Sequence, residues 1–227
     1  MRLHGSEFEC GDTGFAIITR RLWPIAGAAG LSALLLCAPA FAEGYRPVRT
    51  LLELRREGVM IQKWDLSCAA AALATLLRYQ FGDPATENEI ALSLINRGEY
   101  IEHPELVQIR QGFSLLDLKR YVEAHGYKGL GYPALTLNDL IEEAPIMVPI
   151  NALGYNHFVI FRGLMGNRVL LADPAWGNRT MTIEKFQRMW LDYGEPMGHV
   201  GFVVERADGR KPLSKLEPKP AEFVALQ

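Results

Sequence analysis

The distribution of cysteines is the feature that most constrains how this 227-residue chain can fold. Cys10 and Cys37 lie before and within an apolar amino-terminal segment that has the pattern of an export signal. Removal of that segment leaves Cys68 alone, without an intramolecular disulfide partner. The exported protein must then be held by a hydrophobic core, and Cys68 is either an inert core thiol or a reactive one.

The first 42 residues carry the order of a secretion signal. Arg20 and Arg21 are basic, residues 25–37 are apolar, and Ala40 and Ala42 place small side chains where a signal peptidase reads. We predict a signal peptide over residues 1–42, with an unusually long amino terminus. An uncleaved membrane anchor is the alternative, although the apolar run is short for a membrane span.

The remaining chain, about 185 residues, suits one domain with a substantial core. We predict a lead-in segment over residues 43–60, a catalytic domain over 61–206 and a flexible tail over 207–227. Helix patterns come first and strand patterns follow, which indicates an α+β fold with amino-terminal helices packed on an antiparallel sheet. We expect helices from residues 68–80, 86–98, 114–125, 136–142 and 182–190, and strands from 127–132, 146–151, 157–163, 168–173 and 200–205.

Four residues supply the parts of a cysteine peptidase in the papain order. Cys68 opens an alanine-rich helix, where the helix amino terminus favours a thiolate. His157 begins an apolar strand and is the candidate base, and Asp173 is the candidate group that orients the imidazole. Gln62, six residues before the cysteine, can donate a hydrogen bond to the oxyanion of a tetrahedral intermediate.

Each of these residues also has a purely structural interpretation. Cys68 suits a small core position, His157 a hydrogen-bonded core histidine, and Asp173 with Pro174 a turn. The combination in this order favours catalysis. Trp64, Asp65 and Asn156 are candidate substrate contacts, because they adjoin the candidate catalytic residues in sequence.

Several classes of function find no support in the sequence. The net charge is −2 and no basic tract is interleaved with aromatic residues, so we expect no nucleic-acid partner. His103, His125 and His199 are scattered, so we expect no metal site. No phosphate loop or dinucleotide fingerprint is present, and we expect no cofactor.

Four segments resemble the motifs of the C39 cysteine peptidases. They are residues 62–73 around the cysteine, 157–160 at the histidine, 171–175 at the Asp-Pro pair and 181–190 in the helix that follows. The resemblance implies a papain-like fold and cleavage of leader peptides after a double glycine. It also implies that Cys68 is the nucleophile, His157 the base, Asp173 the orienting group and Gln62 the oxyanion donor.

The chain departs from the family pattern at two points. Ser67 and Ala69 flank the cysteine where the family often has Asp and Gly, which puts a strict double-glycine preference in doubt. An export signal replaces the usual transporter context, so the chain is similar to free-standing C39-like peptidases of functional-amyloid secretion in Gram-negative bacteria. That likeness implies a periplasmic location and a peptide or unfolded protein substrate. Amyloid subunits and an outer-membrane export pore are the implied partners, and membrane contact arises only through an uncleaved signal.

Two other functions remain open on the sequence alone. The first alternative to a peptidase is a C39-like module that binds export substrates as a chaperone without cleaving them. The second alternative is acyl transfer to an amine acceptor by the same fold, in the manner of a transglutaminase.

Overall fold

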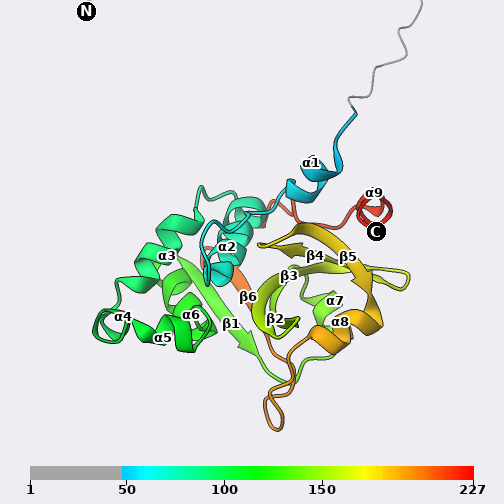
Figure 1. The fold of residues 1–227 in the computed structure, drawn as a ribbon. Helices are drawn as coiled ribbons and strands as arrows, with labels where there is room; N and C mark the ends of the chain where they lie inside the picture. Colours follow the sequence, from blue (N-terminus) through cyan, green and yellow to red (C-terminus); the bar gives the residue numbers. More distant parts are fainter. Residues whose placement is uncertain (1–47) are drawn as a thin grey trace, which may run out of the picture. The chain divides into compact units, whose positions relative to one another are not determined.

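The computed structural model describes residues 48–227, so the predicted signal peptide lies outside the described residues. These residues form one compact unit of helices and a single antiparallel sheet (Figure 1). None of the helices in residues 48–227 combines the length and apolar character that crossing a membrane requires. The helices are α1 (Leu51–Arg56), α2 (Cys68–Thr75), the π-helical turn η1 (Leu76–Phe81), α3 (Glu87–Ile95), α4 (Gly98–Glu102), α5 (Glu105–Ile109), α6 (Leu115–Ala124), α7 (Leu137–Glu142), α8 (Ile183–Met189) and α9 (Pro220–Ala225).

The sheet has six strands in the order β1-β6-β2-β3-β4-β5, and every neighbouring pair is antiparallel. β2, β3, β4 and β5 follow one another as hairpins, whereas β6 returns to lie between β1 and β2. The arrangement confirms the predicted α+β class and antiparallel sheet. The strands are β1 (Tyr127–Tyr132), β2 (Ile146–Ala152), β3 (Tyr155–Met165), β4 (Arg168–Asp173), β5 (Gly177–Thr182) and β6 (Gly201–Arg206).

The alanine-rich helix α2 lies at the centre of the fold. All eight of its residues are buried, and it packs against α3, α6 and strand β3 (Figure 1). Alanine has the highest helix propensity, and its small side chain allows the helix backbone to approach the sheet closely. The helix continues as η1 and ends at Gly82, whose φ of 84° is the left-handed conformation that favours glycine. The predicted helix over residues 68–80 therefore forms as two joined segments.

Two helix starts that the sequence predicts are capping boxes in the structure. Thr86 and Glu89 bond to each other's backbone N–H at the start of α3, and Ser114 and Asp117 do so at α6. Gly98, however, does not end the second helix. α3 ends at Ile95, and Gly98 begins α4 instead. The two short helices α4 and α5 have five residues each, too few to show a helical period in the sequence.

Strand β5 was not expected from the sequence. It begins Gly-Asn-Arg-Thr, which lacks the alternation of apolar and polar residues that marks a half-buried strand. Its pairing with β4 runs over six residues, from Arg168 opposite Thr182 to Asp173 opposite Gly177. Backbone pairing with a buried neighbour, rather than local propensity, makes this segment a strand.

The carboxyl-terminal segment, expected to be a flexible tail, packs on the sheet. Leu216, Phe223 and Leu226 are buried, and the last two form a small cluster with Leu170 of β4. The segment is charged and contains several prolines, which is the composition of disordered chain, but its few apolar residues are spaced to reach one surface. α9 and α1 lie side by side at this edge of the sheet (Figure 1).

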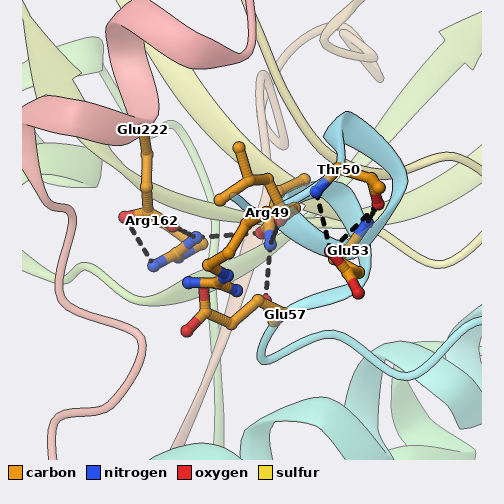
Figure 2. Close-up of polar contacts among 8 residues, drawn as sticks. Arg49, Thr50, Glu53, Glu57, Arg162 and Glu222 are labelled. Carbon is orange, nitrogen blue, oxygen red and sulfur yellow. Dashed lines mark hydrogen bonds and ion pairs between the residues drawn. The ribbon is translucent and has the colours of Figure 1, made fainter. Parts of the chain in front are cut away.

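Arg162 of β3 fixes this segment through polar contacts. The side chain is 3% exposed, and its Nη1 donates to Glu222 Oε1 of α9 at 2.7 Å. Its Nε donates to the Leu216 carbonyl at 2.9 Å, and Nη1 also donates to Asn178 at 2.9 Å. Figure 2 shows Arg162 against Glu222, with the exposed Arg49–Glu57 pair of the α1 region nearby. A buried guanidinium costs free energy unless it is ion-paired and hydrogen-bonded. The carboxyl-terminal segment supplies the acceptors that Arg162 needs.

We predict that Glu222→Ala lowers the free energy of unfolding by about 3 kcal/mol, because it leaves the charge of Arg162 buried without its partner. Urea denaturation followed by circular dichroism measures this change. Glu123→Ala, which removes the exposed ion pair with Lys119, is the matched control and should cost less than about 1 kcal/mol. Equal stability of the Glu222 variant and the control would contradict a structural role for the tail.

Candidate active site

Cys68 is the first residue of α2 and is 1% exposed. Its backbone therefore lies at the helix amino terminus, where free N–H groups favour a negative charge. Ser67 occupies the N-cap position, as its type suggests, but its hydroxyl makes no capping bond. That hydroxyl donates instead to the carboxylate of Glu87, 2.5 Å away.

Glu87 organises the loop that precedes Cys68. It is 3% exposed in the first turn of α3, and its Oε1 accepts from the Lys63 N–H at 2.8 Å and the Trp64 N–H at 3.4 Å, as well as from Ser67. Three donors from one loop thus converge on one buried oxygen. Sequence reasoning missed this residue, because an acidic residue in the first turn of a helix is ordinary and its loop partners lie 20 to 24 residues away.

The loop also contains a strained backbone position. Leu66 has a φ of 68°, which is uncommon for a residue with a branched side chain. A Cβ atom on Gly112 would lie only 2.8 Å from the Leu66 carbonyl oxygen. The loop therefore packs directly on a position that only glycine can fill. Strained backbone of this kind persists where the surroundings hold it, and it is common at functional sites.

Gln62 lies beside the Asp173–Pro174 segment. Its backbone N–H donates to the Pro174 carbonyl at 2.9 Å, and its side-chain Nε2 donates to the Trp64 carbonyl at 3.2 Å. One N–H of the amide is left for another acceptor. The buried Oε1 has no hydrogen-bond partner within residues 48–227. The structure therefore brings Gln62 next to the segment that contains Asp173, although 111 positions separate the two residues in sequence.

His157 and Asp173 form a buried pair across β3 and β4. The His157 Nε2 lies 2.7 Å from Asp173 Oδ1, and the side chains are 4% and 0% exposed. The same oxygen accepts the backbone N–H of Ala175 at 2.9 Å. With Nε2 committed to the carboxylate, Nδ1 is the ring nitrogen available to the Cys68 thiol.

The environment sets the ionisation of this pair. Burial lowers the pKa of His157, but hydrogen bonds and charge from Asp173 and Cys68 outweigh it and raise the pKa to about 9. The dependence on Cys68 reflects its closeness to the imidazole. Burial alone would raise the pKa of Asp173, yet His157, Arg179 and the Ala175 N–H lower it below its usual value. The arrangement therefore favours an imidazolium held by a carboxylate.

Arg179 of β5 contacts the other oxygen of the same carboxylate. Its Nη2 lies 2.7 Å from Asp173 Oδ2, although the two groups are not aligned as a hydrogen bond. Sequence reasoning missed Arg179, because the strand that carries it was not recognised.

The three candidate substrate contacts lie in different surroundings. Trp64 is 46% exposed, Asp65 is also exposed, and both line an open, largely apolar hollow of about 250 Å³ with Ala91, Leu92, Ile95 and Phe113. Asn156 is exposed, but its backbone N–H donates to Gln111 and its side chain accepts from Asn151. Trp64 and Asp65 thus face a hollow next to Ser67, whereas Asn156 is engaged by Asn151 of its own hairpin and by Gln111 of the segment before α6.

Comparison with known proteins places the chain in a family. Residues 56–194 match the Peptidase C39 family, which covers more than half of the sequence. The chain belongs to the peptidase C39 family. The described part of this family member contains no group of three His, Cys, Asp or Glu side chains placed to hold a metal ion.

Two curated relatives carry the name probable functional amyloid protease FapD. The protein from Pseudomonas aeruginosa PAO1 is 36% identical over 148 residues, which is 64% of this chain and 62% of that protein. The protein from Pseudomonas fluorescens is 34% identical over 166 residues, 73% of this chain and 69% of that protein. The match to the first relative thus spans somewhat less than two thirds of its length.

The solved peptidase domain of Streptococcus ComA, described as a bifunctional ABC transporter involved in quorum sensing, has the same fold. It superposes with a TM-score of 0.50 at 15% identity, over 65% of this chain and 97% of that domain. The predicted papain-like C39 fold is therefore confirmed.

We predict that Glu87→Ala loosens the loop before Cys68, since it removes the acceptor of three donors and costs about 2 to 3 kcal/mol of stability. Hydrogen exchange of the Lys63 and Trp64 amides should accelerate at least about tenfold relative to the native protein. Glu102→Ala, at an exposed position in α4, is the control and should leave both amides protected. Unchanged exchange in Glu87→Ala would show that other contacts hold the loop.

Proposed function

We propose that the protein is a cysteine endopeptidase in which Cys68 is the nucleophile, His157 the general acid and base, and Asp173 the group that orients the imidazole. The observation that carries the proposal is the buried His157–Asp173 hydrogen bond of 2.7 Å, in a pair whose imidazole pKa is also raised by the nearby Cys68. Membership of the peptidase C39 family supports the same assignment.

The proposed reaction proceeds through a thioester. The Cys68 thiolate attacks the scissile carbonyl carbon, and the carbonyl electron pair moves to oxygen. The backbone N–H of Cys68 and the free amide N–H of Gln62 stabilise that oxyanion. As the C–N bond breaks, the His157 Nδ1–H gives its proton to the leaving amine. A water molecule then loses a proton to His157 and attacks the thioester, which releases the carboxylic acid and restores the thiolate.

We expect Cys68→Ala to lower peptide cleavage by at least about a thousandfold, because no other group can form the acyl-enzyme. Mass spectrometry of a peptide mixture incubated with each protein measures cleavage, and Ser93→Ala on the exposed face of α3 is the control. Hydrolysis yields two fragments that together gain one water, whereas transfer to an amine yields a conjugate. Equal cleavage by Cys68→Ala would refute the mechanism.

The raised pKa of His157 predicts a particular pH dependence. The imidazolium, which donates the proton to the leaving group, is present below its pKa of about 9 and is lost as the pH rises through that value. We expect kcat/KM to decline on an alkaline limb near pH 9. Asp173→Asn removes the carboxylate that raises this pKa, so the limb should move to lower pH, and an unmoved limb would show that it reports another group.

We further propose that the enzyme acts in the periplasm on extended segments of exported proteins, and that functional-amyloid subunits are its substrates. The export pattern of residues 1–42 and the similarity to the FapD proteins support this setting. An outer-membrane export pore is the corresponding partner. Mass spectrometry of secreted subunits from cells with active protein or Cys68→Ala tests the proposal. Full export and unaltered subunits with Cys68→Ala would favour a chaperone module instead.

A further inference from the structure

Arg179 stands out among the charged residues because it contacts the candidate catalytic carboxylate and has no role in the reaction described above. It lies on β5 in register with Leu171, while Asp173 is in register with Gly177. Arg179 and Asp173 are therefore diagonal neighbours, and Gly177 places no side chain between them. The guanidinium reaches Asp173 Oδ2 at 2.7 Å, and the Arg179 side chain is 24% exposed.

The contact supplies charge rather than hydrogen bonds. Asp173 Oδ1 is engaged by His157 and by the Ala175 N–H, which leaves Oδ2 to Arg179. The buried Arg179 Nε and Nη2 have no hydrogen-bond partner within the described residues. A mostly buried cation with unused donors is expensive to desolvate, and such a pair contributes little to stability. Its consequence lies in the electrostatics of the carboxylate that it touches.

We propose that Arg179 is a positioning residue of the candidate active site: it fixes the Asp173 carboxylate from the side opposite His157 and offsets part of its negative charge. The proposal rests on the proposed function for its effect on catalysis, but its effect on His157 can be measured without any substrate.

The offset matters because Asp173 alone would bind the imidazolium too firmly. A carboxylate next to a histidine stabilises the protonated ring, and a nearby cation weakens that stabilisation. An imidazolium whose proton is held too tightly is a poor general acid. Arg179 thus keeps the ring oriented by an ionised carboxylate while leaving its proton easier to transfer.

The test is an NMR titration of the His157 ring in the native protein, Arg179→Gln and Arg179→Lys. The chain has five histidines, and His157→Gln assigns the resonance of interest. We expect the His157 midpoint to rise by about one pH unit in Arg179→Gln, since the cation is lost. Arg179→Lys keeps the charge and should stay within about 0.3 unit of the native midpoint.

Arg168→Gln is the matched control. Arg168 lies at the other end of β4 and donates to Thr180, so its loss removes hydrogen bonds from the same sheet without removing the cation at Asp173. It should leave the His157 midpoint unchanged. In the cleavage assay, the alkaline limb of Arg179→Gln should move upward with the NMR midpoint, and kcat at neutral pH should fall about tenfold with little change in KM.

An unchanged His157 midpoint in folded Arg179→Gln would overturn the proposal and leave Arg179 a purely structural residue. If Arg179→Gln does not fold, the comparison of Arg179→Lys with the native protein decides: a His157 midpoint displaced by about one pH unit although the positive charge is retained would overturn the proposal as well. A native protein that titrates as expected but cleaves no peptide would refute the proposed function and leave the electrostatic role of Arg179 standing.

Discussion

The hydrogen bond between His157 and Asp173 is the contact on which the candidate site depends. It joins two adjacent strands, and its geometry follows from the sheet: Ile160 pairs with Ala172, so the histidine reaches the end of β4 diagonally. Both side chains are almost fully buried, which makes the pair strong only while each partner remains ionised and bonded. The sheet thus provides a rigid support for one half of the site, and α2 brings the thiol to it.

Two charged side chains, the buried Glu87 and the half-buried Arg179, make further contacts around the candidate site. Glu87 gathers the backbone of the loop between Gln62 and Cys68, and Arg179 engages the far side of the Asp173 carboxylate. Neither contact resembles the exposed ion pairs of the helices, which are weak and screened by solvent. A site that needs both an ionised carboxylate and a constrained loop requires such outer contacts to hold its geometry.

The sequence was informative where the structural role of a residue depends on its neighbours in the chain. Cys68 could be placed at a helix start by Ser67 and the alanines after it, and His157 lies in a strand with a clear apolar run. Glu87 and Arg179 could not be assigned, because their roles arise only when distant segments meet. β5 escaped recognition for a related reason, since its polar residues form a strand by pairing with β4.

Two segments, α1 with the residue after it and the carboxyl terminus, contact the edge of the sheet that carries Arg179. At one end of β5, Asn178 donates to the Glu57 carbonyl at 2.6 Å, and the Arg55 carbonyl lies where a side chain on Gly177 would be. In the middle of β5, Thr180 donates to the Leu226 carbonyl at 2.9 Å. α9 and most of α1 fall outside the residues that match the C39 family, and they lie against β4 and the edge strand β5. The strand that carries Arg179 is therefore contacted by segments on both sides of the matched residues.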